Sequence, residues 1–129
     1  QVVGFSENPT SLLNFLYSKI TLCQPFEIWS KVKRNLIDVE DIIDILSMLI
    51  ENVELHQKII NIASPYSLSM QEIIDVMEEY FNNKANYKVV EKGGEYIVDI
   101  EIVKKEINIK KIFLPTSEAH VKALLMKYF

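Results

Sequence analysis

The stretch Pro25-Phe-Glu-Ile-Trp-Ser-Lys-Val-Lys-Arg-Asn-Leu-Ile-Asp-Val-Glu-Asp41 holds the signals that decide the fold of this chain. It predicts a short strand that ends on Trp29, a basic turn, a second short strand, and an acidic cap at Asp38 that opens a helix. The turn carries Lys33 and Arg34, so cationic groups are expected near an aromatic ring. Because cations bind phosphate oxygens and stack on aromatic faces, this stretch suits a ligand with an anion and a flat ring, such as a nucleoside diphosphate.

Further stretches continue the pattern in order, from about residue 2 to residue 111. They are Val2-Val-Gly4, Ser11-Leu-Leu13, Ile59-Ile-Asn-Ile-Ala-Ser64, Ser67-Leu-Ser-Met-Gln-Glu72, and Lys92-Gly-Gly-Glu95 with Asp99 after it. With the 25–41 stretch, this succession resembles the extended short-chain dehydrogenase/reductase family, which contains nucleotide-sugar epimerases, dehydratases and reductases. The resemblance covers nearly the whole chain.

In that family, a dinucleotide-binding domain precedes a smaller substrate-binding domain. The resemblance therefore implies that residues 1–129 form a single substrate-binding domain of the α+β class, rich in helix with a few short strands. Residues 1–7 would be the remnant of the last strand of a missing dinucleotide-binding (Rossmann) domain. The parent protein would be an NAD(P)-dependent nucleotide-sugar epimerase, dehydratase or reductase. NAD or NADP would bind in that missing domain, and this chain alone would be inactive.

The resemblance also implies a set of substrate-binding residues and no catalytic residue in this chain. The set comprises Arg34, Trp29, Asn35, Ser11, Leu12, Lys92 and Glu95. Arg34 matches the arginine that contacts the substrate diphosphate, and Trp29 matches the aromatic residue that packs on the nucleotide base. Lys92 and Glu95 match an arginine and an aspartate that hold phosphate and ribose.

Two of these residues have a purely structural alternative, and three positions depart from the pattern of the family. Arg34 can pair with Asp38 or Glu40 on the surface, and Trp29 can serve in packing. Asn35 stands where most family members carry aspartate, which keeps hydrogen bonding but removes a charge. Lysine at position 92 loses the bidentate geometry of arginine, and glycine at position 93 loosens a turn that proline holds in the family.

The cofactor-binding and catalytic motifs of the family are expected elsewhere. None of the three glycines follows a strand and opens a helix, as a pyrophosphate-binding turn requires. Tyr80 and Lys84 have the spacing of the catalytic Tyr-x-x-x-Lys, but they follow the nucleotide-sugar motif instead of preceding it. We interpret them as a surface pair at the end of a helix.

Composition and charge narrow the kinds of partner and the cellular location that are expected for this chain. The chain has 129 residues with 49% hydrophobic and 25% charged residues, which is typical of a globular domain. Its net charge of −4 predicts no nucleic-acid partner, and no apolar run is long enough to predict a membrane partner. A single cysteine, Cys23, is expected to be buried, while His56 and His120 are expected on the surface. Together with the lack of a signal peptide, this predicts a cytoplasmic protein.

The local patterns predict the following elements: a helix from Asn8 and Pro9 to about residue 22, strands at 26–29 and 35–37, a helix from 38 to about 52, a strand at 58–62, a helix at 70–82, a strand at 87–90, a helix at 100–107, and a helix from Thr116 or Ser117 to about 128. Ser69 and Glu72 form a capping box for the helix at 70–82. Asp99 caps the helix at 100–107.

A second function, of another class, stays open. The chain could be a non-catalytic interaction domain that keeps the fold and binds a protein partner, and the altered Lys92-Gly-Gly-Glu95 motif favours it. The lack of an initiator methionine is expected of a fragment. Exposed Val2, Val3 and Phe5 would then favour a homodimer. A glycine-rich turn and a Tyr-x-x-x-Lys motif in the sequence upstream of Gln1 would favour the enzyme function over the interaction domain.

Overall fold

A computed structural model describes residues 1–55, 57–106, 108 and 111–129. The helices are α1 (Leu12–Thr21), α2 (Val39–Glu51), α3 (Met70–Phe81), α4 (Glu101–Glu106) and α5 (Ser117–Tyr128), with a 3₁₀ turn at Val53–Leu55. The strands are β1 (Val2–Val3), β2 (Phe26–Trp29), β3 (Lys33–Arg34), β4 (Ile37–Asp38), β5 (Leu68–Ser69) and β6 (Tyr87–Val90). The predicted α+β class, with dominant helices and short strands, is confirmed. No helix in the described ranges is long and apolar enough to cross a membrane.

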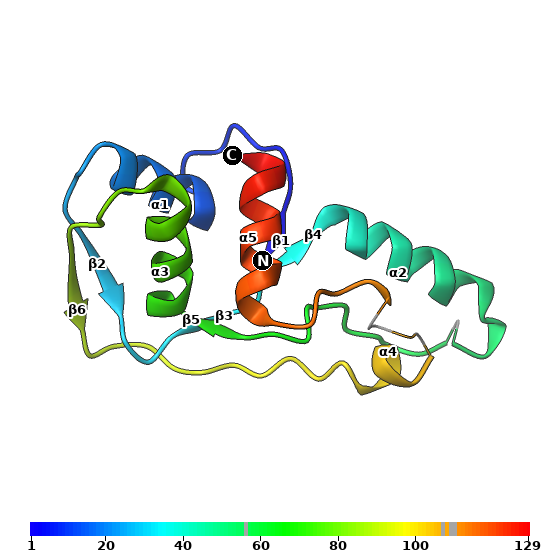
Figure 1. The fold of residues 1–129 in the computed structure, drawn as a ribbon. Helices are drawn as coiled ribbons and strands as arrows, with labels where there is room; N and C mark the ends of the chain where they lie inside the picture. The colour runs from blue at the N-terminus through cyan, green and yellow to red at the C-terminus, as the bar shows by residue number, and fades with distance from the viewer. Residues whose placement is uncertain (56, 107, 109–110) are drawn as a thin grey trace.

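The strands form three separate pairs. β1 pairs with β4 and β2 pairs with β6, both in parallel, while β3 pairs with β5 in the antiparallel sense. Figure 1 shows α1, α3, β2 and β6 at one end of the molecule and α2 with α4 at the other. Helix α5 and the β3–β5 pair lie between the two ends.

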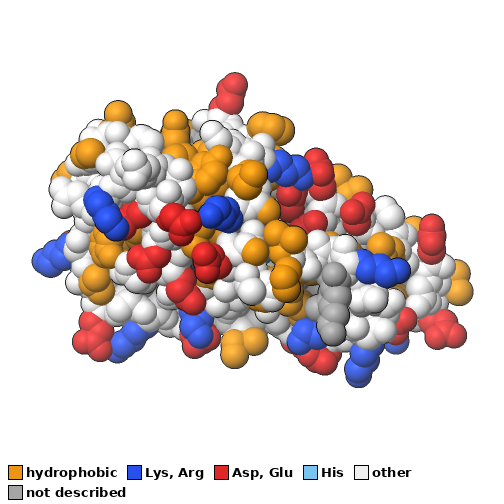
Figure 2. Space-filling model, viewed as in Figure 1, with side chains coloured by type: hydrophobic (Ala, Val, Ile, Leu, Met, Phe, Trp, Pro, Cys, Tyr) orange, Lys and Arg blue, Asp and Glu red, His pale blue; other side chains and the backbone are white. Residues whose placement is uncertain are grey.

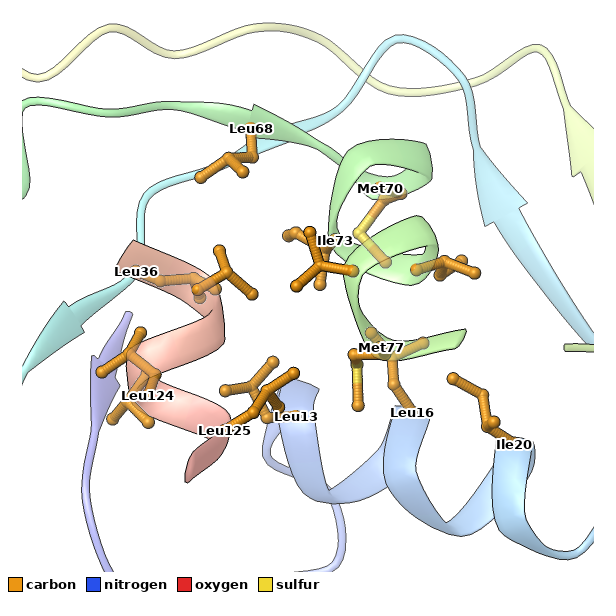
Figure 3. Close-up of a cluster of buried hydrophobic side chains, with 14 of the residues drawn as sticks. Leu13, Leu16, Ile20, Leu36, Leu68, Met70, Ile73, Met77, Leu124 and Leu125 are labelled. Atoms are coloured by element: carbon orange, nitrogen blue, oxygen red, sulfur yellow. The ribbon is translucent and has the colours of Figure 1, made fainter. Parts of the chain in front are cut away.

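The larger hydrophobic core lies between α1, α3 and α5. Each helix presents its buried side chains at helical spacing, such as Leu16 and Ile20 on α1, and these side chains interdigitate in the close-up of Figure 3. Full burial of one such side chain contributes about 1.5–3 kcal/mol. A second core holds α2 and α4 together through residues such as Ile45 and Val103. Tyr66 packs against both cores.

Local capping signals place the starts of α2, α3 and α5 accurately. The Asp38 carboxylate accepts from the Glu40 N–H at the start of α2, and Ser69 and Glu72 form the predicted capping box of α3. Thr116 caps α5 by accepting from the Ala119 N–H. These caps are local in sequence, which explains why the pattern alone predicted them.

Two predicted boundaries are wrong. Helix α1 begins at Leu12, because Asn8 uses its side-chain oxygen to close a turn at Thr10 instead of capping a helix. Residues 35 and 36 also fall between β3 and β4, so the predicted strand at 35–37 is replaced by two shorter strands.

The predicted strand at 58–62 is also wrong. Ile60 and Ile62 pack against the second core, Ile59 is 95% exposed, and Asn61 donates to the Asp99 carbonyl at 3.1 Å. In the described ranges no strand pairs with this segment. Its β-branched residues therefore supply packing without a ladder of backbone hydrogen bonds.

Cys23 and His120 correct two burial predictions, and His56 lies outside the described residues. Cys23 is exposed and has a φ of 51°, because it follows the C-terminus of α1. His120 is buried, and its Nε2 lies 3.0 Å from the Leu36 carbonyl oxygen. Its ring also contacts Phe113, so this histidine joins α5 to the core.

Candidate functional site

Arg34 lies on β3, opposite Leu68 of β5. Its Nε is buried and is the sole buried side-chain polar atom in the described residues without a hydrogen-bond partner. An unsatisfied buried N–H costs about 1–3 kcal/mol, so natural structures rarely keep one without a reason. The guanidinium therefore has unused hydrogen-bonding capacity.

The structural alternative for Arg34 does not hold. Its suggested partners, Asp38 and Glu40, bind Lys127 instead, with Nζ–oxygen distances of 2.8 and 2.6 Å. Tyr128 adds a third contact by donating to the Asp38 carboxylate at 2.6 Å. Within the described ranges, Arg34 makes no ion pair with a carboxylate.

The Asp38 site is a structural junction. Burial would raise the pKa of Asp38, but hydrogen bonds from Lys127, Tyr128 and the Glu40 N–H together lower this pKa below its ordinary value. The same contacts raise the pKa of Lys127, with the hydrogen bond to Asp38 as the main cause. Sequence reasoning predicted the cap at Asp38 and missed Lys127 and Tyr128, which lie about ninety residues further along the chain.

The Asn35 side chain makes three hydrogen bonds with backbone groups. Its amide nitrogen donates to the carbonyls of Ser64 and Tyr66 at 2.8 and 2.9 Å, and its oxygen accepts from the Ser64 N–H at 3.0 Å. Aspartate could accept the last of these bonds but could not donate the other two. This explains asparagine here and gives Asn35 the geometry of a residue that positions its neighbour Arg34. Direct contact of Asn35 with a substrate stays a prediction.

The segment 91–95 runs beside the turn at residues 30–33. The Lys31 N–H donates to the Lys92 carbonyl at 3.2 Å, and two surface ion pairs join the segments, Lys31–Glu91 at 2.8 Å and Lys33–Glu95 at 2.7 Å. The hydrogen bond to Glu95 is the main reason that the pKa of Lys33 is raised. The structure thus brings the predicted residues Lys92 and Glu95 next to the basic turn.

Glu95 contacts Lys33 and not Arg34. Successive strand residues point to opposite faces, so the Lys33–Glu95 pair and the Arg34 guanidinium lie on different sides of β3. Trp29 is half exposed at the end of β2, and an added Cβ at Gly93 would be in van der Waals contact with its ring at 3.5 Å.

Ser11 and Leu12 line a cavity of about 500 Å³ at the N-terminus of α1. The Ser11 side chain makes no capping bond to the helix, so the first N–H groups of α1 lack a side-chain acceptor there. The cavity wall also includes Gly4, which belongs to the Val2-Val-Gly4 stretch, and Gln1 and Phe129, for which the sequence gives no local signal.

The seven predicted residues therefore fall into two groups. Ser11 and Leu12 line the cavity, while the other five lie on or beside the segments 29–35 and 92–95. Gln1 connects the groups, because it lines the cavity and its backbone nitrogen donates to the Asn35 carbonyl at 2.5 Å.

Comparison with known proteins gives a match in fold. Neither a protein-family model nor a curated protein matches the sequence. Among solved structures, the enzyme WbmG of Bordetella bronchiseptica, in complex with NAD and UDP, matches with a TM-score of 0.78 and 16% identity over 99% of this chain and 42% of that one. UDP-glucuronic acid 4-epimerase from Bacillus cereus, in complex with NAD, gives 0.71 and 18% over 100% and 43%.

A third match is dTDP-glucose 4,6-dehydratase from Bacillus anthracis, in complex with NAD, with a TM-score of 0.70 and 14% identity over 98% of this chain and 41% of that one. The chain has part of the extended short-chain dehydrogenase fold. This confirms the resemblance at the level of fold. The chain spans less than half the length of these structures.

Proposed function

We propose that this chain is the nucleotide-sugar-binding part of an NAD(P)-dependent epimerase, dehydratase or reductase. The observation that carries the proposal is the Arg34 guanidinium, whose Nε is buried without a partner while both nearby carboxylates are taken by Lys127. The planar guanidinium suits two oxygens of a diphosphate, which would bind its terminal nitrogens. The neighbours that match in fold include structures with UDP and UDP-glucuronic acid.

Each residue of the set has a task under this proposal. Arg34 binds the diphosphate, and Asn35 fixes the backbone on which Arg34 sits. Half-exposed Trp29 offers a face to the nucleotide base, and Lys92 and Glu95 approach phosphate and ribose from the neighbouring segment. Ser11 and Leu12 meet the ligand at the N-terminus of α1, where free N–H groups favour an anion.

The chemistry would need a second domain. NAD or NADP would bind in a dinucleotide-binding domain and would accept and return the hydride there. The acid/base residue would also come from that domain, so this chain alone would bind and orient the substrate without converting it. Its contribution is the position of the diphosphate relative to the second domain.

One observation favours the second candidate function, a non-catalytic interaction domain that binds a protein partner. Glu95 is held by Lys33 on the face of β3 opposite Arg34, so the half of the site expected to bind ribose is engaged in an internal ion pair. In an interaction domain that no longer binds a nucleotide, Glu95 would be free to serve in this ion pair with Lys33.

The direct test uses the Arg34 Nε–H signal in ¹H–¹⁵N spectra of the isolated chain. UDP-glucuronic acid and inorganic pyrophosphate should both shift this signal, whereas uridine, which lacks phosphate, should not. Repeating the titration at about 0.15 M salt or above controls for non-specific attraction to surface lysines, because exposed charges more than about 8 Å apart are then largely screened. If UDP-glucuronic acid leaves the Arg34 signal unchanged at millimolar concentration, the interaction-domain function is favoured.

A further inference from the structure

Phe129 forms part of the wall of the cavity at the N-terminus of α1. It follows α5 directly, and its N–H donates to the Leu125 carbonyl at 2.9 Å. Tyr17 and Phe81 pack against its ring, with centroid separations of 5.3 and 6.4 Å. Phe129 is 37% exposed, so part of its surface is accessible. It therefore offers the cavity an apolar ring that two other aromatic residues support.

Four side chains tie this end of α5 to the start of α2. The Asp38 carboxylate accepts from the Tyr128 hydroxyl at 2.6 Å with one oxygen and from Lys127 Nζ at 2.8 Å with the other. Lys127 Nζ also lies 2.6 Å from a Glu40 carboxylate oxygen. In Figure 2, a basic side chain lies among acidic ones where the end of α5 meets the start of α2. We call Asp38, Glu40, Lys127 and Tyr128 the α2–α5 clasp.

The α2–α5 clasp is more than a helix cap needs. Capping of α2 uses one bond, from the Glu40 N–H to the Asp38 carboxylate at 2.9 Å. Ser69 and Thr116 cap α3 and α5 in the same way without a buried charge. Asp38 is only 7% exposed, and a buried carboxylate is costly unless hydrogen bonds and an opposite charge satisfy it. The aspartate at this position therefore serves the contact with α5 and not the cap alone.

The α2–α5 clasp and the cavity lie against each other. Leu36 and Val39, which stand on either side of Asp38 in the sequence, line the cavity. Phe5 lines it too, and its ring packs edge-on against the Tyr128 ring with the centroids 5.0 Å apart. Figure 1 shows the N-terminal segment passing beside the end of α5. Loss of the clasp would therefore loosen the cavity wall on the α5 side.

The lining of the cavity suits the face of a sugar ring. Apolar residues such as Leu12, Leu13 and Phe129 make up most of it, and Gln1 and Ser11 are among its few polar residues. None of the described residues that line it carries a charged side chain. A sugar ring presents C–H groups on its faces and hydroxyl groups at its rim, so an apolar and aromatic surface with a few polar groups fits it. An uncharged sugar fits this lining better than one that carries a carboxylate.

We infer that Phe129 contacts the sugar of a nucleotide sugar and that the α2–α5 clasp, centred on Asp38, positions Phe129 for this contact. The inference rests on the proposed function, in which the ligand meets this cavity at the N-terminus of α1. It adds the class of sugar, an uncharged ring, and the residue that packs on it. Arg34 is not among the described residues that line the cavity, so the diphosphate and the sugar are bound by different parts of the site. Phe129 should therefore affect affinity for the sugar nucleotide and not for the bare nucleotide.

The test compares the dissociation constants of UDP-glucose, UDP-glucuronic acid and UDP, each titrated into this chain and followed in ¹H–¹⁵N spectra. The wild type should bind UDP-glucose more tightly than either of the other two ligands. Phe129→Ala should weaken UDP-glucose binding by roughly 3- to 10-fold, the range of a single aromatic contact. The same substitution should leave the dissociation constant of UDP within about 2-fold of the wild-type value.

A second variant breaks the α2–α5 clasp and leaves Phe129 in place. Lys127→Met with Tyr128→Phe removes the contacts to Asp38 but keeps the cap of α2, and it should weaken UDP-glucose binding selectively, as Phe129→Ala does. Lys122→Met is the matched control, because it removes an exposed ion pair of α5 that lies outside the clasp. This control should bind all three ligands as the wild type does.

Three results would overturn the inference: a wild type that binds UDP-glucose no better than UDP, a Phe129→Ala variant that changes both affinities equally, or a clasp variant that keeps the wild-type preference for UDP-glucose. Melting temperatures of the same samples identify a purely structural clasp, which would lower the melting temperature without changing the ratio of the two dissociation constants. The Arg34 Nε–H signal separates this inference from the proposed function. A shift with UDP and an unchanged ratio in Phe129→Ala rejects the sugar contact alone, and no shift with any of the three ligands rejects both.

Discussion

Replacing Asn35 by aspartate tests whether this side chain holds the site together. The change is nearly isosteric, but it removes two donors, to the carbonyls of Ser64 and Tyr66 at 2.8 and 2.9 Å. Each lost hydrogen bond costs about 0.5–1.5 kcal/mol, and a partly buried carboxylate facing two carbonyl oxygens adds a desolvation cost. We expect Asn35→Asp to lower the free energy of unfolding by about 2–4 kcal/mol, where each kcal/mol corresponds to a few degrees in melting temperature.

Urea denaturation at pH 7 measures this change, with the slope of unfolding free energy against urea checked for constancy. Asn61→Asp is the matched control, because Asn61 donates one exposed hydrogen bond, to the Asp99 carbonyl. The control should lose less than about 1 kcal/mol. Equal losses in the two variants would refute the assignment of Asn35 as the residue that anchors the 63–66 segment beside Arg34.

Three further predictions follow from single features. Because folding lowers the pKa of Asp38, the ionised Asp38 carboxylate stabilises the fold above about pH 4. This stabilisation is lost as the pH falls through the pKa of Asp38 in the folded state, so the urea midpoints of the wild type and of Asp38→Asn should converge in acid. Gly93→Ala should destabilise by about 1–3 kcal/mol, because φ is +93° and an added Cβ would lie 2.1 Å from Val32 Cγ2. Gly94→Ala is the control and should change stability by less than about 0.5 kcal/mol, because no atom lies near its added Cβ. Calorimetry should show no saturable binding of NAD or NADP by the isolated chain, because none of its three glycines lies in a pyrophosphate-binding turn.

Much of the helical structure could be predicted because its signals are local. The caps at Asp38, Ser69 and Thr116 each involve residues within three positions, and the apolar spacing that follows them is regular. The fold class followed from these helices together with the short strands. The resemblance of ordered motifs reached further than periodicity, because it predicted the fold that the solved structures confirm.

Features that depend on distant residues could not be predicted. The strand at 58–62 has the right composition, but a strand exists only where a partner pairs with it. The Asp38–Lys127 contact joins residues 89 apart, and the burial of His120 depends on the carbonyl of Leu36. The lack of an ion-pair partner for Arg34 in the described residues could not be predicted either. The sequence places Asp38 and Glu40 close to Arg34, but in the folded chain both bind Lys127.

The central claim is that Arg34 binds a diphosphate, and one pair of measurements on Arg34→Ala tests it most directly. In the protein that contains the dinucleotide-binding domain, affinity for UDP-glucuronic acid should fall by about 1.5–3 kcal/mol, which is roughly ten- to a hundred-fold. The melting temperature should not fall by much, since Arg34 makes no ion pair within the described ranges and the substitution also removes a buried N–H without a partner. Arg34→Lys should recover part of the affinity, and Lys33→Ala, on the opposite face of β3, should leave most of it intact. Unchanged affinity with a lowered melting temperature would contradict the account.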